Sequence, residues 1–435
     1  MSRQAVLSKE FLSNFGSATG YPKDKLEGLR SVAKKQFMEM LPPDVKDEQW
    51  KYTRISNILK TDYQTISQRK NIAVNQYTFF GKEVTRLVFV DGKYDKSCSI
   101  LHSEDEIEII PISEALEKNI KHAKDLFGKT AGEHTGYFTI LNATVLNEGV
   151  FIHVPPDTVL TQPIELIHIT TEQSVAANLR NLIIVGQNSS VEFVNNYNTV
   201  NGSAFTNQVT ELVLKADAQV KYNFVQKEGM LSNQINSLYV DQEKGSSFYA
   251  VTFTCGGRLV RNEVFVNLKG KHTYTDLVGL FLCTGNQHVD NHTRIDHKMP
   301  ECSSRELYKG VISGSSTAVF NGKVYVWPDA QKTNAYQSNR NILLSESASV
   351  YAKPELEIYA DDVKCSHGSA TGKLDEEAMF YLRSRGVSKD MARELLVRAF
   401  IEEVFEGGTS NLMVDVVKQL MDKWFTRIHN KGKKS

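Results

Sequence analysis

A short pattern of residues returns at nearly constant spacing between about residues 131 and 364. In each copy a turn of small or polar residues leads into an apolar–polar–apolar strand start. The first residues of three such starts, Val191, Val220 and Phe248, are 29 and 28 residues apart (220 − 191 and 248 − 220), and Val319 and Val350 are 31 apart (350 − 319). Recurrence near this length is typical of a solenoid, in which each coil packs on its neighbours.

The coils of this solenoid are predicted to consist of strands. Apolar runs follow one another with hardly a helical window, and Asn-Gly hairpin signals are scarce, which disfavours a β-sandwich. We therefore predict a mainly β protein with a parallel β-helix at its centre. The distance of 71 residues from Phe248 to Val319 (319 − 248) breaks the period. The clearest runs are 149–154, 164–169, 182–185, 210–214 and 322–326.

The region before the solenoid, residues 1–130, has a mixed α/β pattern. Apolar residues at helical spacing predict a helix from Leu26 to Phe37, which Pro42 and Pro43 stop. A strand is predicted at 87–90, closed by a turn at Asp91-Gly92, and residues 111–127 are again helical in pattern.

The region after the solenoid, residues 365–435, is predicted to be helical. Asp375 can cap a first helix that Gly386 ends, and Ser388 can cap a second helix. A last helix begins at Thr409 or Ser410. It carries the cleanest apolar stripe of the chain, which either packs on the protein's own core or docks a partner. The stripe consists of Met413, Val416, Val417, Leu420, Met421 and Trp424.

Composition excludes several classes of protein. The chain has 435 residues, with 51 Lys and Arg against 51 Asp and Glu. A net charge of zero argues against a nucleic-acid binder and against attachment to anionic membranes, because both need a basic excess. No segment approaches the roughly 20 apolar residues that span a bilayer, and the start of the chain lacks the apolar stretch of a signal peptide. Five dispersed cysteines without a C-x-x-C pair favour reduced thiols and a cytoplasmic location.

Two motifs invite a chemical interpretation that the sequence does not support. A phosphate-binding loop at 127–130 would need a second glycine at position 123, which is Ala123, so we expect an ordinary surface loop and no nucleotide hydrolysis. His288, His292 and His297 do not share one strand face, so we expect solvated histidines on the solenoid and no metal.

The stretch 361–368 carries the densest chemistry. Cys365 and His367, at i and i+2 on a strand, project from one face, and Lys364 beside them would favour a thiolate. Thiolate and imidazole suit soft metals and iron–sulfur clusters. Two ligands do not complete a site, so the others would come from another chain or from exogenous groups. A Cys–His hydrolase would need an orienting group and an oxyanion hole, for which no signature is present.

Residues 361–386 resemble the carboxy-terminal signature of the SufB/SufD family, whose members are subunits of the SUF iron–sulfur cluster assembly system. The resemblance is to the SufD branch. A SufB-type sequence would have His-Glu-Ala in place of residues 365–368, and a cysteine near the position of Asn339. Other segments that share the resemblance are 48–53, 87–92, 320–322, 341–345 and 354–360.

The resemblance implies a right-handed parallel β-helix and a non-enzymatic role in a complex. It implies a heterodimer with SufB, joined at the carboxy-terminal ends of both β-helices, and docking of the ATPase SufC on the terminal helices. His367 matches a SufD histidine associated with iron or a nascent cluster, and Cys365 matches a nearby accessory cysteine. No cofactor would be held permanently, since iron or a cluster would be shared with SufB. The stripe residues assigned in part to SufC docking are Met413, Val416, Val417, Leu420 and Trp424.

Two other classes remain as alternatives. A stand-alone scaffold would form its own homodimer and hold a cluster without SufB. A β-helix enzyme acting on polysaccharide would carry an acidic or aromatic groove, but no acidic pair stands out at solenoid spacing.

Overall fold

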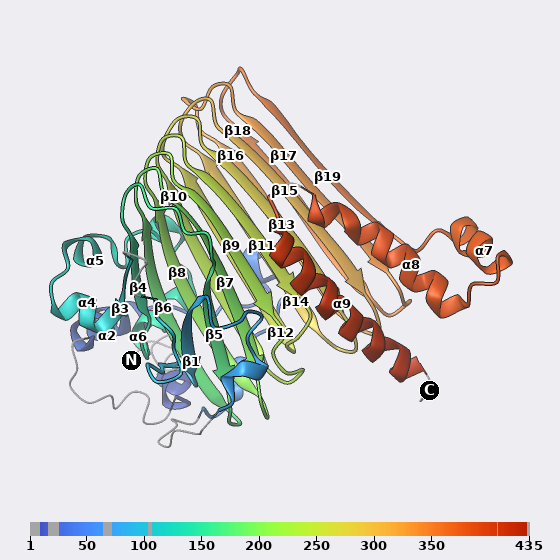
Figure 1. The fold of residues 1–435 in the computed structure, drawn as a ribbon, viewed down its shortest axis with the longest axis horizontal. Coiled ribbons are helices and arrows are strands. Elements are labelled where there is room, and N and C mark those ends of the chain that lie inside the picture. Colours follow the sequence, from blue (N-terminus) through green and yellow to red (C-terminus); the bar gives the residue numbers. More distant parts are fainter. Residues whose placement is uncertain (1–8, 16–25, 64–71, 103–106, 407, 433–435) are drawn as a thin grey trace.

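The computed structural model describes residues 9–15, 26–63, 72–102, 107–406 and 408–432. Within these residues the strands form two sheets, sheet A and sheet B, and from residue 150 onward strands that follow one another along the chain alternate between them (Figure 1). Sheet A contains β3 (Glu108–Pro111), β4 (Val150–Val154), β6 (Val175–Val185), β8 (Ala204–Leu214), β10 (Asn233–Gln242), β12 (Leu259–Leu268), β14 (His288–His297), β16 (Thr317–Val326) and β18 (Ser349–Ile358).

Sheet B contains the other strand of each coil, and its neighbours from β1 through β5 to β19 are parallel. The predicted parallel β-solenoid is therefore confirmed. Its strands are β1 (Thr85–Val90), β2 (Lys93–Tyr94), β5 (Ile164–Thr170), β7 (Ser190–Thr199), β9 (Gln219–Gln226), β11 (Ser247–Thr254), β13 (Tyr274–Cys283), β15 (Ser303–Ile312), β17 (Asn334–Leu343) and β19 (Lys364–Gly372).

The repeat seen in the sequence corresponds to one register column of sheet B. Val191 pairs with Val220, and Val220 pairs with Phe248. The next positions in this column are Thr275 and Ser304. The coil length persists through the apparent gap, but polar residues replace the apolar anchors, so the pattern is no longer visible in the sequence.

Val319 and Val350 belong to sheet A, and they are not register partners. Val319 pairs with Tyr351, and Val350 pairs with Ala318. The interval between the two valines is therefore one residue short of the true coil. Because a shift of one residue moves a side chain to the other face of a strand, Val319 points outward while Val350 contacts the inner core.

One corner of the solenoid places a residue with positive φ in successive coils. Asn, Asp and Gly adopt this left-handed conformation most easily, so the corners of the early coils are recognisable as turns in the sequence. The later coils place His, Glu and Lys at this corner, which removes the turn signal. The corner residues are Asp157, Asn188, Asp217, Gly245, His272, Glu301 and Lys332.

Inward side chains of both sheets form one apolar cluster that extends from Leu87 in the first coil to Ala348 near the last. Burying one large apolar side chain contributes about 1.5–3 kcal/mol, so this interior is the main stabilising element. Buried amides also point inward and occupy one register column of sheet A: Gln208, Asn236, Asn262 and Asn291.

Most helices of the amino-terminal region cover the outer face of sheet A, whereas Val74 of the 3-10 helix 74–76 packs on the outer face of sheet B. The predicted helix 26–37 is confirmed as α2 (Glu27–Phe37). The segment 111–127 forms two short helices instead of one, because Asn119 between them has a φ of 52°. α6 falls within the region that we predicted to be solenoid. The other elements are η2 (Glu48–Trp50), α3 (Ser56–Lys60), η3 (Val74–Gln76), α4 (Ile112–Glu117), α5 (Lys121–Leu126), η4 (Gly132–His134) and α6 (Tyr137–Thr144).

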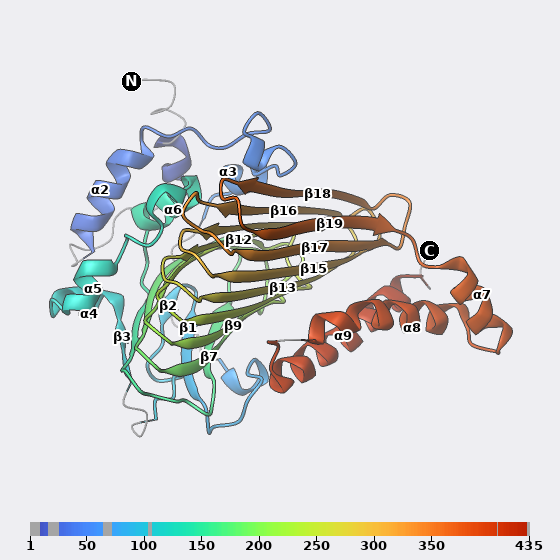
Figure 2. The same cartoon turned by 90° about the horizontal axis from the view of Figure 1, so that it is seen from above.

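Two of the carboxy-terminal helices, residues 389–401 and 411–432, lie along the outer face of sheet B, and the helix 376–384 projects away from it (Figure 2). Their caps are as predicted: the side chain of Asp375 accepts from two backbone amides of the first helix, and Ser388 and Ser410 each accept one. Gly386 follows the first helix with a φ of 87°. The elements are α7 (Glu376–Ser384), α8 (Lys389–Ile401), η5 (Glu402–Phe405) and α9 (Asn411–Gly432). None of the helices in the described residues is long and apolar enough to cross a membrane.

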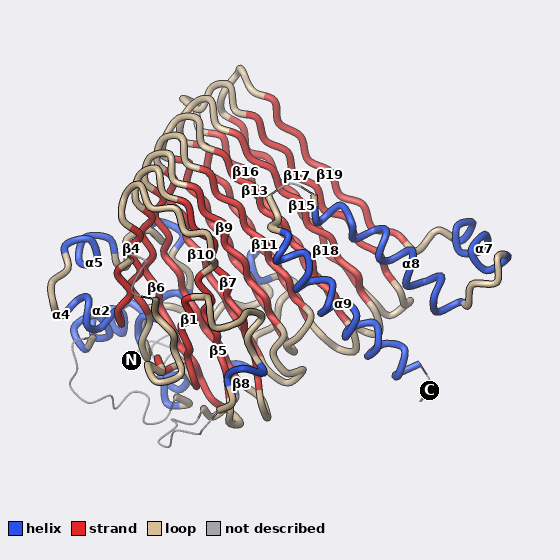
Figure 3. The backbone as a smooth tube through the Cα atoms, in the orientation of Figure 1, coloured by secondary structure: helices blue, strands red, loops and turns tan. Residues whose placement is uncertain are grey.

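The two ends of the solenoid are built differently. At the first coil β2 pairs antiparallel with β1, and β3 pairs antiparallel with β4. At the last coil β18 and β19 are the outermost strands of their sheets, and no described strand pairs beyond them (Figure 3). Most residues of β19 are exposed. The solenoid therefore ends open at this side.

Candidate functional site

Cys365 and His367 lie on β19, the last strand of the solenoid, which extends beyond the boundary of 364 expected for the solenoid. They pair with Ala335 and Gln337 of β17. Ala335 and Gln337 are buried inward residues, so Cys365 and His367 also face the interior side of the sheet. The two side chains therefore share one face at the open end, as the spacing predicted.

The thiol of Cys365 is half-buried and contacts a small apolar cluster that includes Val326, Ala335 and Ala360. Burial raises the pKa of this thiol above its ordinary value. The expectation that Lys364 favours a thiolate is wrong, because neighbouring residues of a strand point to opposite faces. Cys365 is therefore a protonated thiol at neutral pH.

Asn339 lies on the same inward face of β17 and is fully buried. Its amide donates to the backbone oxygen of Tyr308 at 3.2 Å and accepts from Asn341 at 2.7 Å. The position at which a SufB-type sequence would carry a cysteine thus holds a hydrogen-bonded amide here, which offers no thiol to the interior.

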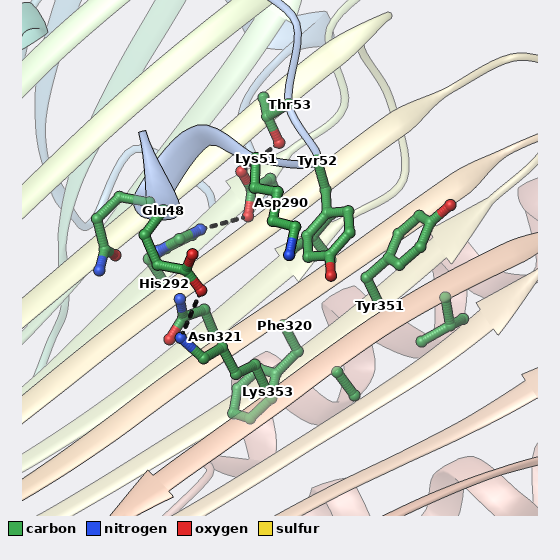
Figure 4. Close-up of a pocket in the computed structure, with 14 residues that line it drawn as sticks. Glu48, Lys51, Tyr52, Thr53, Asp290, His292, Phe320, Asn321, Tyr351 and Lys353 are labelled. Atoms are coloured by element: carbon green, nitrogen blue, oxygen red, sulfur yellow. Dashed lines mark hydrogen bonds and ion pairs between the residues drawn. The ribbon is translucent and has the colours of Figure 1, made fainter. Parts of the chain in front are cut away.

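A second candidate region lies on the outer face of sheet A. Residues 48–53 cross β14, β16 and β18 and enclose a pocket of about 480 Å³ (Figure 4). The ring of Tyr52 stacks on Tyr351 with the centroids 4.1 Å apart, and Lys353 forms an ion pair with Glu48 at 2.8 Å. The amino-terminal segment is thereby attached to β18, the last strand of its sheet.

Beneath this segment, Asp290 joins a buried polar network. Its carboxylate accepts hydrogen bonds from Thr53 at 2.5 Å and from Arg261 at 2.6 Å, and it pairs with His292 at 2.8 Å. Although burial opposes it, the neighbouring His292 and Arg261 hold the pKa of Asp290 well below its usual range. Arg261 also stacks on Trp50 at 3.7 Å. These groups satisfy one another and attach the segment to the solenoid.

His292 and His297 of β14 are buried and His288 is partly buried, so the expectation of solvated histidines was wrong. His292 points outward, but the amino-terminal segment covers it, and His288 beside it accepts or donates a hydrogen bond with Thr53 at 2.8 Å. His297 points into the interior, where it is fully buried. As predicted, His288 and His292 share one face of β14 and His297 lies on the other. The described residues contain no group of three His, Cys, Asp or Glu side chains that could hold a metal ion.

The loop 127–130 lies at the surface, as expected, with Gly128 and Lys129 exposed, and it docks on the solenoid through its backbone. The backbone amides of Gly128 and Thr130 donate to the carboxylate of Glu211 at 2.7 and 3.1 Å. Since a carboxylate of the chain itself occupies these donors, the loop is not arranged to bind a phosphate.

Comparison with known proteins covers nearly the whole chain. The family profile described as "SUF system FeS cluster assembly, SufBD core domain" matches residues 168–400, and the profile "SufBD protein N-terminal region" matches residues 11–166. The chain belongs to the SufBD family. The core match spans β5 to α8 and includes the Cys365–His367 strand.

Relatives of this SufBD protein are similar over most of their length. Protein ABCI7, chloroplastic, of Arabidopsis thaliana is 31% identical over 395 residues, which are 88% of this chain and 82% of that protein. The protein named "Iron-sulfur cluster assembly protein SufD" of Escherichia coli is 28% identical over 371 residues, 84% and 85% of the two chains. A protein of the same name from Bacillus subtilis is 29% identical over 300 residues, 67% and 68% of the two chains. The SufD names agree with the branch inferred from residues 365–368.

The stripe of α9 packs on the solenoid of this SufBD chain. All of the side chains assigned to docking are buried among outward residues of sheet B such as Val251 and Leu280. In this conformation they contact their own chain, and a docking role would require α9 to separate from sheet B. The five residues are Met413, Val416, Val417, Leu420 and Trp424.

A different apolar surface of the helical region is open. α7 has no buried residue and projects from the body (Figures 1 and 2). Phe380 is 75% exposed and Tyr381 59% exposed, and on α8 Met391 and Leu395 are also exposed. We call these four residues the arm surface. These residues were not predicted as a surface, although two adjacent aromatic residues on a short helix with charged neighbours are a usable signal in the sequence.

Proposed function

We propose that this chain is a non-enzymatic SufD-type subunit of a scaffold that assembles iron–sulfur clusters together with SufB and SufC. The observation that carries the proposal is the placement of Cys365 and His367, side by side on the interior face of the last, uncovered strand. Such a position is open to iron from outside and also adjoins any chain that covers the solenoid end.

The open end supports pairing with SufB. Edge strands present unpaired backbone donors and acceptors, which natural proteins usually cover. β18 and β19 leave such edges, together with inward side chains of the last coil. A second solenoid of the same family could continue both sheets. The same edges fit a second copy of this chain, so the homodimeric scaffold remains the alternative.

The two side chains have distinct roles in this proposal. An exposed imidazole can donate a lone pair to iron directly, whereas the protonated thiol of Cys365 must first lose its proton. His367 would therefore be the first ligand, and Cys365 would join when a cluster forms. The remaining ligands would come from SufB or from exogenous groups, so iron or the cluster is a transient cargo.

SufC docking belongs to the same proposal. We assign it first to the arm surface, because exposed apolar residues that project from the body suit an interface. The buried stripe of α9 would take part only if ATP-driven movement of SufC pulled α9 from sheet B. A cytoplasmic location is also part of the proposal, and fractionation of cells that express a tagged chain tests it.

The decisive experiment is cluster formation on the complex of this chain with SufB and SufC. His367→Ala is expected to reduce iron and sulfide bound per complex several-fold while the three chains still purify together. His122→Ala, which removes an exposed histidine on α5, is the matched control. Equal iron content in the His367→Ala complex and the wild type would contradict the ligand role. Formation of a cluster by the chain without SufB would favour the homodimer instead.

A further inference from the structure

Behind His367, two buried polar side chains occupy the same position in the two preceding coils of sheet B. Glu306 of β15 pairs with Gln337 of β17, and Gln337 pairs with His367 of β19. The three strands lie side by side in Figure 2. Glu306 and Gln337 are 1% and 3% exposed, whereas His367 is exposed. They form a row that leads from the interior to the candidate ligand.

Hydrogen bonds along this row are incomplete. The Gln337 amide nitrogen donates to Oε2 of Glu306 at 2.6 Å. The amide oxygen of Gln337 has no hydrogen-bond partner among the described residues, whereas the Glu306 carboxyl also interacts with the side chain of Thr293. Leaving a buried amide oxygen without a donor is unfavourable, so the exposed neighbour in register is the natural group to satisfy it.

The opposite sheet keeps the amide of Gln337 in place. A Cβ on Gly322 would lie 2.3 Å from Nε2 of Gln337 and 2.7 Å from the ring of Phe320. Only a glycine leaves this space, so the amide is confined between Gly322 and Glu306. With its nitrogen directed back to Glu306, the amide presents its oxygen to another neighbour.

We propose that Gln337 and Glu306 are positioning residues for His367. Gln337 accepts a hydrogen bond from one ring N–H of His367, and Glu306 orients Gln337 by accepting from its amide nitrogen. The bond selects one tautomer and one ring orientation, which leaves the other ring nitrogen free to bind iron. Histidines that bind metal are generally held in this way through their second nitrogen. The metal-binding part of this inference rests on the proposed function.

The state of Glu306 is compatible with this arrangement. Burial raises the pKa of Glu306 to about 7, and the hydrogen bond from Gln337 opposes this rise. Either form of the carboxyl can accept from the amide of Gln337, so the row persists on both sides of neutrality.

Two measurements on the full-length chain test the positioning. Nitrogen chemical shifts of His367, recorded by NMR on ¹⁵N-histidine protein, report the tautomer without any metal. We expect one dominant tautomer in the wild type, and a mixture in Gln337→Met, which removes the acceptor oxygen. Gln337→Glu keeps an oxygen at the same reach and is expected to restore the single tautomer. Affinity for Co²⁺ should fall about 10–100-fold in Gln337→Met.

Asn341→Met is the matched control, because Asn341 lies on the same strand and face and is also 3% exposed. It should leave the shifts of His367 unchanged. Wild-type shifts in Gln337→Met, or an equal change in Asn341→Met, would overturn the inference. If His367→Ala binds Co²⁺ as well as the wild type, His367 is not a metal ligand. The nitrogen shifts of His367 would still show whether Gln337 positions its ring.

Discussion

The closed end and the open end of the solenoid use the same coil but differ in what covers them. At the first coil, antiparallel strands protect the edges, and Tyr94, Ile107 and Ile109 pack on the inner core. At the last coil, no additional described strand pairs with β18 or β19, and most residues of β19 are exposed. The same kind of coil thus forms part of the structural core at the closed end and offers an interaction site at the open end.

The histidines that point into the solenoid differ in exposure and in pKa according to their distance from the open end. His168, near the closed end, is stacked between Phe89 and Tyr197 with ring centroids 5.0 and 4.3 Å away. Burial lowers the pKa of His168 to about 3, and that of His297 to about 3 as well. Both are neutral packing groups. His367 has the same inward orientation but is exposed, so only this one can receive a metal from outside.

The largest expected effect concerns the core at the closed end. Phe89→Ala removes a ring that is 1% exposed and should lower the free energy of unfolding by about 3–5 kcal/mol. His367→Ala at the open end should change it by less than about 0.5 kcal/mol. Urea unfolding followed by circular dichroism measures both. Equal losses would mean that the two ends do not differ in packing.

An intermediate effect concerns pH. The folded-state pKa of His168 lies below its unfolded value, so the unfolded chain binds a proton that the native chain does not. Stability is therefore complete above pH about 6.5 and falls as the pH decreases towards 3, by up to about 1.4 kcal/mol per pH unit for this group. His168→Phe should weaken this dependence.

Urea midpoints of the wild type and His168→Phe between pH 4 and 8 provide the measurement. The difference between the two proteins should be constant above pH 7 and should change only below it. Parallel curves over the whole range would show that His168 is not held neutral by burial.

The smallest effect on stability is expected at the open end itself. Ala352→Lys places a charge on an exposed inward position of β18. It should change the free energy of unfolding by less than about 0.5 kcal/mol, yet weaken association with SufB, or with a second copy, by tenfold or more. Sedimentation and co-purification measure this, with the exposed loop variant Leu231→Lys as control. Unchanged association would place the interface elsewhere.

Local patterns in the sequence were sufficient for much of this structure. Helix caps at Asp375, Ser388 and Ser410 and the shared face of Cys365 and His367 depend only on residues within a few positions. The row behind His367 could also be found from the sequence, since Gln337 precedes His367 by 30 residues (367 − 337) and Glu306 precedes Gln337 by 31 (337 − 306). The row was not predicted, because the repeat was recognised from apolar residues and the row consists of polar ones.

The sequence by itself determined the coil length, the alternation of inward and outward side chains, and the residues that a SufBD protein carries at its last coil. The tertiary structure decided which of those residues are accessible. Residues 48–53 cover His288 and His292, and α9 covers sheet B; both contacts join segments that are far apart in the chain. Local propensity carries no information about such contacts. These contacts are stabilised by burial against residues that are distant in the sequence. They leave one end of the solenoid and one helical arm uncovered.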